Sequence, residues 1–201
     1  KSLVSTVTEG GQLRMEIVEK PMPVPKADQV LIKVEACPIN PSDHGVMFGY
    51  SDMSSAKNEG DVLVAPVPPM GMRMMKARIG QALPLGNEGA GTVVAAGESD
   101  AAQALMGRTV AAMGGGMYAE YRAVPVMSVL PVNDGNTARQ AASSFVNPLT
   151  ALCFPETMKN EGHSAIVHTA AASNLGQMLV KICKADGIPL VNIVRKQEQV
   201  D

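Results

Sequence analysis

Alternating apolar and polar positions predict several β-strands within residues 1–136. Residues 29–36 alternate and are rich in branched side chains, and residues 90–97 form a second apolar run that ends at a glycine. Residues 108–113 and 117–124 flank three glycines, which we interpret as a turn that pairs these two segments. Short strands separated by prolines and turns are typical of a compact β-barrel.

Residues 51–83 depart from this pattern. Three prolines, at positions 66, 68 and 69, precede a methionine-rich run from Met70 to Ile79. This run predicts a short helix within a surface insertion. A methionine-rich helix is usually packed against the rest of the protein, and a substrate lid or a subunit contact is the alternative.

Helical periodicity begins after residue 136, where we expect the first domain to end. Thr137 is placed to cap a helix that continues to Ala142. Residues 145–148 are expected to interrupt the helix, and Leu149 to Met158 to resume it. The expected domains are therefore 1–136, with the insertion 51–83, and 137–201.

The last forty or so residues have the pattern of a strand, a tight turn, a helix and a second strand. The strands are expected at 164–169 and 189–194, on either side of a helix with an apolar face. This order is typical of a βαβ unit that binds a dinucleotide, because small residues let the backbone approach the pyrophosphate at the helix N-terminus. The candidate pyrophosphate-binding residues in the turn are Ala171, Ser173, Asn174, Leu175 and Gly176.

Two basic residues, Arg195 and Lys196, follow the second strand. In dinucleotide-binding units this position contacts the adenosine ribose, and a carboxylate there favours NADH. Here the cationic side chains would attract a 2′-phosphate, so the sequence predicts NADPH. The alternative is that both residues only keep the strand end solvated.

Composition narrows the possible functions. Apolar residues make up 46% of the chain and charged residues 18%, with a net charge of −2, so a globular protein is expected and a nucleic-acid surface is not. The three cysteines are scattered, which favours a reducing compartment, and the cytoplasm is the expected location. No apolar run is long enough for a membrane span, and no signal-peptide pattern is present.

Five motifs in order carry a resemblance to a known family. They are residues 36–43 (ACPINPSD), 86–91 (GNEGAG), 147–151 (NPLTA), 171–176 (AASNLG) and 191–195 (VNIVR). Together they resemble the medium-chain dehydrogenase/reductase superfamily, and within it the zinc-free quinone oxidoreductase and mitochondrial-type enoyl thioester reductase branches.

The resemblance implies an α/β chain with a GroES-like β-barrel domain, followed by a Rossmann domain (a doubly wound parallel sheet). NADP binds between these domains in the family, and relatives commonly form homodimers. Only the first βαβ unit of the Rossmann sheet is expected within these 201 residues. We therefore expect the 201-residue chain alone to be truncated and catalytically inactive.

The resemblance also implies that the zinc site of other family members is lost. Asn40 and Asn87 stand where zinc-bearing members have a cysteine and a histidine, and an amide cannot replace these ligands. We predict no metal, and one zinc per full-length chain would contradict this. A zinc-type alcohol dehydrogenase is the alternative that these amides disfavour.

Catalytic candidates follow from the same resemblance. Tyr50 is the candidate proton donor, although its spacing is one residue shorter than in the enoyl reductases, and Asn40 is a candidate to hold the substrate or the nicotinamide ribose. Asn147 and Thr150 stand where the family contacts the nicotinamide end. The alternatives are a packed tyrosine, a turn-forming asparagine and a threonine bonded to its own helix turn.

The predicted function is that of an NADPH-dependent, zinc-independent oxidoreductase that delivers hydride to a small molecule, either a quinone or an α,β-unsaturated carbonyl or enoyl substrate. A non-catalytic NADPH-binding protein is the alternative from another functional class. Tyr50→Phe separates the two, because loss of turnover with retained NADPH binding supports catalysis.

Overall fold

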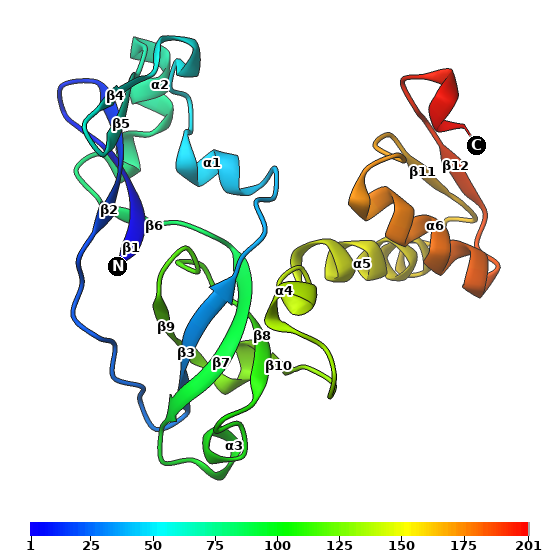
Figure 1. Cartoon of the computed structure of the whole chain (residues 1–201). Helices are drawn as coiled ribbons and strands as arrows, with labels where there is room; N and C mark the ends of the chain where they lie inside the picture. The colour runs from blue at the N-terminus through cyan, green and yellow to red at the C-terminus, as the bar shows by residue number, and fades with distance from the viewer. Residues whose placement is uncertain (201) are drawn as a thin grey trace. The chain divides into compact units, whose positions relative to one another are not determined.

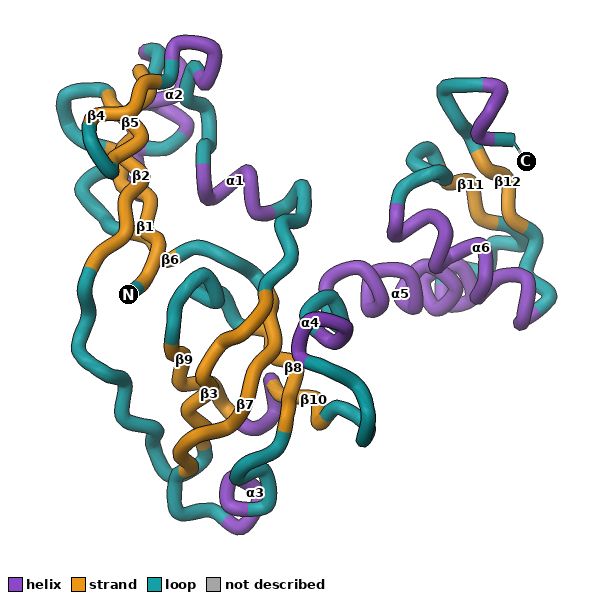
Figure 2. The backbone as a smooth tube through the Cα atoms, in the orientation of Figure 1, coloured by secondary structure: helices purple, strands orange, loops and turns teal. Residues whose placement is uncertain are grey.

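The computed structural model describes residues 1–200, which divide into two compact units. Unit 1 is Lys1–Ser143 and unit 2 begins at Ser144 (Figures 1 and 2). The domain boundary expected from the sequence, after residue 136, lies before the boundary between the two units, which follows Ser143. As a result, the short helix that Thr137 caps belongs to unit 1.

The first sheet of unit 1 has five strands in the order β4-β5-β2-β1-β6, and all neighbours are antiparallel. Their bounds are β1 Ser2–Val7, β2 Gln12–Val18, β4 Lys57–Glu59, β5 Val62–Pro66 and β6 Leu83–Pro84. Val7 and Leu13 point into a core and are fully buried there. In β1 four of the six residues are buried and the other two, Leu3 and Thr6, are half-buried, so both faces of this strand are largely covered.

The surface location expected for residues 51–83 is wrong. This segment supplies β4, β5 and β6 of the first sheet, and Ala65, Val67 and Met75 are buried against Val7 and Leu13. The expected short helix is present as α2 (Pro69–Met74). The prolines obscured the strands, because they stand at the strand end and at the start of the helix, where no ladder hydrogen bond is lost.

The second sheet of unit 1 also has five strands, in the order β10-β8-β7-β3-β9. Their bounds are β3 Gln29–Ala36, β7 Glu88–Ala96, β8 Thr109–Met113, β9 Tyr121–Pro125 and β10 Val129–Pro131. Its buried branched residues, including Val30, Ile32, Val93 and Val110, form a second core cluster.

The predicted pairing of residues 108–113 with 117–124 is wrong. β8 pairs with β7 and β10, whereas β9 pairs with β3 at the far edge of the sheet. The residues after the three glycines do not turn straight back. Instead, the Tyr118 amide donates to the Leu85 carbonyl and the Leu3 amide donates to the Tyr118 carbonyl, so this segment bridges distant parts of unit 1.

Helices in unit 1 are short. The α-helices are α1 Asp43–Met47, α2, α3 Asp100–Gln103 and α4 Ala138–Ala141, and the 3₁₀ turns are η1 Met53–Ser55, η2 Lys76–Arg78 and η3 Val126–Ser128. The predicted cap by Thr137 is confirmed, since its hydroxyl accepts from the Gln140 amide at 3.3 Å within a capping box.

Unit 2 contains a parallel strand pair joined through a helix. Its elements are α5 Val146–Asn160, β11 Ile166–His168, α6 Asn174–Asp186, β12 Leu190–Asn192 and the 3₁₀ turn η4 Gln197–Gln199. Val167 pairs with Val191 in the parallel register. The predicted strand–turn–helix–strand order is therefore present.

The expected helix interruption is present, but it lies at residues 142–145 between α4 and α5, and α5 already runs through Pro148. This proline lies in the first helical turn, where backbone N–H groups have no partner within the helix and a proline is tolerated. Packing of α5 and α6 on β11 then forms the core of unit 2, in which Ala151, Ile166, Leu179 and Cys183 are buried. Within the described residues, the helices are all too short or too polar to cross a bilayer.

Candidate functional site

The turn before α6 is built around Ser173 and Gly176. The Ser173 hydroxyl accepts a hydrogen bond from the Gly176 amide at 3.0 Å and so caps the helix. A Cβ placed on Gly176 would overlap the carbonyl oxygen of Ala171 and lie 2.7 Å from that of Ala170. Only glycine therefore allows the helix to approach the turn this closely, as a dinucleotide-binding unit requires.

A cavity of about 440 Å³ lies beside this turn. Its lining includes the turn residues Ala171 and Ser173 and, from the segment after β12, Arg195 and Gln199. The structure thus brings together the two parts of the predicted coenzyme site. Asn174, Leu175 and Gly176 form the first turn of α6 behind the lining residues.

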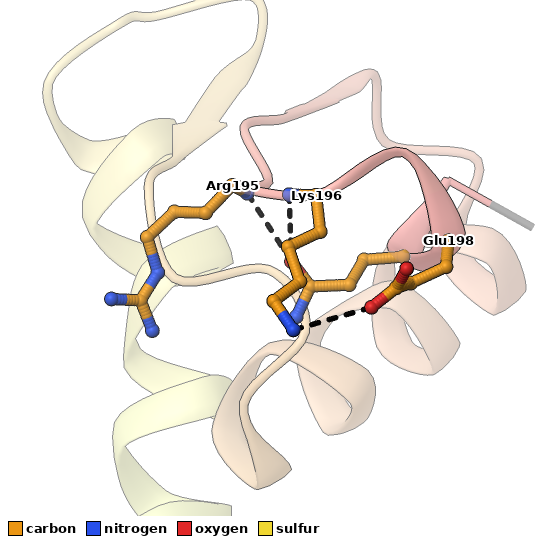
Figure 3. A network of polar contacts seen from close by, with 4 residues as sticks. Arg195, Lys196 and Glu198 are labelled. Atoms are coloured by element: carbon orange, nitrogen blue, oxygen red, sulfur yellow. Dashed lines mark hydrogen bonds and ion pairs between the residues drawn. The ribbon is translucent and has the colours of Figure 1, made fainter.

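The two cationic side chains at this end of β12 have different surroundings (Figure 3). The Lys196 ammonium lies 3.2 Å from the Glu198 carboxylate. The Arg195 guanidinium extends away from this pair, and no residue from 1 to 200 forms an ion pair or hydrogen bond with it. Arg195 therefore offers the cavity a positive charge that no described carboxylate balances. A phosphate beside the small-residue turn would fit this arrangement.

The two residues that the sequence places at the nicotinamide end, Asn147 and Thr150, lie in α5. The Thr150 hydroxyl donates to the Val146 carbonyl at 2.6 Å, which is the alternative role considered for it. Asn147 is half-buried in the first turn of the same helix. His168 is buried against the ring of Phe154, and its Nδ1 finds no hydrogen-bond partner among the described residues.

A buried polar network in unit 1 joins the two motif loops 36–43 and 86–91. Asn40, Asp43 and Glu88 are each less than 5% exposed. Asn40 donates from its side-chain amide to Glu88 at 2.9 Å, and its backbone N–H donates to Asp43 at 2.7 Å. Asp43 also accepts from the Asn87 backbone N–H at 2.9 Å. The carboxylates of Asp43 and Glu88 therefore fix the candidate residue Asn40 from two sides.

Sequence reasoning did not predict the part that Asp43 plays in this network. Its signal is the short Asn-Pro-Ser-Asp spacing, in which an aspartate can bond the amide three residues before it. The partner loop, however, lies more than forty residues further along the chain. Nothing in the local pattern shows that the two loops meet.

The negative charge of the network acts on two neighbouring groups. Burial, together with Asp43 and Glu88, raises the pKa of the Cys37 thiol to about 11. Burial and the same carboxylates also raise the pKa of the Tyr118 phenol, whose hydroxyl donates to the Pro38 carbonyl at 2.9 Å. Both groups are therefore neutral at physiological pH.

We expect Cys37 to resist alkylation. A pKa of about 11 leaves roughly one thiol in a thousand ionised at pH 8, and only the thiolate reacts. Cys153, which is exposed on α5, serves as the internal control. Peptide mass spectrometry after iodoacetamide treatment should find Cys153 modified at least tenfold faster, and equal rates in the folded protein would contradict the prediction.

Tyr50 lies outside this network. Its side chain is 56% exposed, and its backbone N–H lies 3.5 Å from the Met75 sulfur. No residue from 1 to 200 forms a hydrogen bond with its hydroxyl, so the phenol can donate to a bound molecule. Nearby, Arg78 of η2 holds the C-terminal end of α1, where its guanidinium donates to the Val46 carbonyl at 2.9 Å.

Asn40 and Asn87, at the positions where the resemblance places zinc ligands in other family members, do not fit a metal. The Asn87 side-chain amide donates to the Ser42 hydroxyl at 3.1 Å, and the Asn40 amide donates to Glu88. Amide N–H₂ groups turned toward oxygen acceptors are not zinc ligands. Across residues 1–200, no three His, Cys, Asp or Glu side chains are grouped so that they could hold a metal ion.

Comparison with known proteins identifies the family. The Alcohol dehydrogenase GroES-like domain family matches residues 26–134, more than half of the chain. The chain belongs to the medium-chain dehydrogenase/reductase superfamily. The fold expected from the motif resemblance is confirmed, and unit 1 is the GroES-like part of this superfamily's architecture.

Relatives of this chain include proteins named as reductases and others named as synaptic vesicle membrane protein VAT-1 homologs. The mitochondrial enoyl-[acyl-carrier-protein] reductase of Caenorhabditis elegans is 27% identical over 181 residues, which are 88% of this chain and 45% of that protein. The crystal structure of a Mesorhizobium loti protein assigned as an NADPH:quinone reductase is 32% identical with a TM-score of 0.64, covering 89% of this chain and 46% of the other. A mycobacterial structure solved with NADPH is 25% identical with a TM-score of 0.67, covering 99% and 54%.

The chain thus spans about half the length of these relatives. Several of the similar solved structures were determined in complex with NADPH.

Proposed function

We propose that this protein is an NADPH-dependent, zinc-independent oxidoreductase that delivers hydride to a quinone or to an α,β-unsaturated carbonyl or enoyl substrate. One observation carries the proposal: the small-residue turn before α6 and the unbalanced guanidinium of Arg195 line the same cavity. Relatives described as quinone and enoyl reductases support the class of acceptor.

The residues of unit 2 would hold the coenzyme. Backbone N–H groups of the turn 171–176 and the N-terminus of α6 suit a pyrophosphate, and Arg195, with Lys196, suits a 2′-phosphate. Asn147 and Thr150 would lie toward the nicotinamide end. The bound coenzyme supplies the hydride, and the protein supplies binding, orientation and a proton.

The residues of unit 1 would act on the acceptor. With amides at positions 40 and 87, no metal Lewis acid polarises the substrate, so a protein donor has to stabilise the oxygen on which charge develops. Tyr50 is our candidate, because its exposed phenol can first donate a hydrogen bond and then a proton. Asn40, fixed by Asp43 and Glu88, would position the substrate or the ribose.

Arg195→Ala tests the coenzyme assignment. Loss of a charge-assisted hydrogen bond should raise the Kd for NADPH about 10- to 100-fold, while the Kd for NADH changes less than about threefold. The measurement is fluorescence titration of each coenzyme into the full-length protein. Lys184→Ala, which removes an exposed cation from the last turn of α6, is the matched control. Unchanged coenzyme preference in the Arg195 variant would contradict the assignment.

An acceptor screen with quinones, enones and enoyl thioesters then tests turnover. We expect activity in the full-length protein and none in residues 1–201 alone, because unit 2 offers one side of a coenzyme site. The domain division 1–136 and 137–201, homodimer formation and a cytoplasmic location remain predictions of the same proposal.

A further inference from the structure

Gln199 holds the segment that carries the two cationic residues. Its side-chain oxygen, Oε1, accepts hydrogen bonds from the backbone N–H groups of both Arg195 and Lys196, each at 3.2 Å. These two N–H groups follow the end of β12 and have no strand partner there. One side chain thus closes the loop 195–199 on itself.

The closed loop separates the two cations. Lys196 is directed to Glu198, with its ammonium 3.2 Å from that carboxylate. Arg195 lines the cavity beside the small-residue turn, and Lys196 does not. Gln199 itself lines this cavity and the neighbouring one of about 700 Å³ against α6, so it lies where a coenzyme's adenosine end would rest.

From this geometry we infer that Gln199 is a specificity-determining positioning residue, which sets the preference for a coenzyme with a 2′-phosphate by fixing the backbone of Arg195. The inference rests on the proposed NADPH dependence. It makes Arg195 the main contact for the 2′-phosphate, because Lys196 is paired with Glu198. Gln199 touches no phosphate in this scheme and acts through the conformation of the loop.

The effect of Gln199 on phosphate affinity is expected because it reduces the conformational freedom of the Arg195 side chain before the ligand binds. An arginine on an unrestrained loop samples many positions, and its affinity for a phosphate falls in proportion to the fraction of time spent in the binding position. Two backbone hydrogen bonds to one side chain raise that fraction before the ligand arrives. NADH lacks the 2′-phosphate, so its affinity does not depend on this fraction.

Gln199→Met tests the inference, because methionine keeps the size of the side chain but removes the acceptor oxygen. The Kd for NADPH should rise about tenfold, the effect of losing backbone hydrogen bonds of ordinary strength, and the Kd for NADH should change less than about twofold. Gln197→Met is the matched control, since Gln197 lies on the same turn and its side chain makes no hydrogen bond with the described residues.

The double variant with Arg195→Ala separates the two proposals. If Gln199 acts through Arg195, Gln199→Met causes no further loss of NADPH affinity in the Arg195→Ala background. A full additional loss there, or parallel losses of NADPH and NADH affinity, or no loss at all, would overturn the inference. If Arg195→Ala by itself leaves the NADPH preference intact, it is the proposed function that fails.

Discussion

Gly176→Ala is expected to loosen unit 2 and to abolish coenzyme binding with it. The added Cβ would overlap the Ala171 carbonyl oxygen and lie 2.6 Å from the carbonyl carbon, and neither atom can move without displacing the turn. Forcing backbone apart in a packed site costs about 2–3 kcal/mol. Because α6 packs on β11 through Leu179 and Cys183, the whole βαβ unit bears this cost.

Hydrogen exchange measures the effect within unit 2. Amides of α6 should exchange about 100-fold faster in the variant, which corresponds to the expected loss of local stability. Gly45→Ala in α1 is the matched control, because a Cβ at that exposed helical position meets nothing within 4 Å. Unchanged exchange of α6 in Gly176→Ala would show that the turn accommodates a methyl group, contrary to the geometry.

Asp43→Ala is expected to have the largest effect in unit 1. The substitution leaves the backbone N–H groups of Asn40 and Asn87 without their acceptor in a site where Asp43 itself is 2% exposed. Breaking a buried network of this kind costs about 2–4 kcal/mol. Urea unfolding followed by circular dichroism should show the loss, whereas Asp61→Ala, at an exposed position between β4 and β5, should change stability by less than about 0.5 kcal/mol.

The same variant should also change the reactivity of the neighbouring thiol of Cys37. Asp43 is one of the charges that raise the pKa of Cys37, so its removal lowers that pKa and increases the fraction of reactive thiolate. Under native conditions Cys37 should therefore be alkylated faster in Asp43→Ala than in the parent protein. A slower or equal rate would mean that Asp43 does not influence the thiol.

Local patterns in the sequence were sufficient where a local cause decides the structure. Alternation predicted residues 29–36 as a strand with the bounds that β3 has. Small residues and an apolar face predicted the turn and α6. The residues that begin and end this helix are local: Ser173 caps its N-terminus, and Gly187, with a φ of 66°, ends it.

Patterns failed where the partner lies elsewhere. Alternation of apolar and polar residues predicts a strand but not which strand it pairs with. The sequence therefore paired β8 with β9 across the three glycines, which is wrong. Residues 51–83 were placed on the surface because their prolines hid strands that only the pairing with β1 and β2 makes evident. Gln199 was missed for a related reason, since a polar side chain in a short turn gives no signal until its acceptor oxygen is seen beside Arg195.

The difference in sequence separation between the two units has a kinetic consequence. β11, α6 and β12 meet within residues 166–192, whereas Ser2 pairs with Ala119 and β3 pairs with β7 and β9 in unit 1. Chains dominated by distant pairings fold more slowly than chains with near ones, because long loops have to close first. Maturation of this protein should therefore be limited by the assembly of its two antiparallel sheets, and residues 166–192 should acquire their shape early.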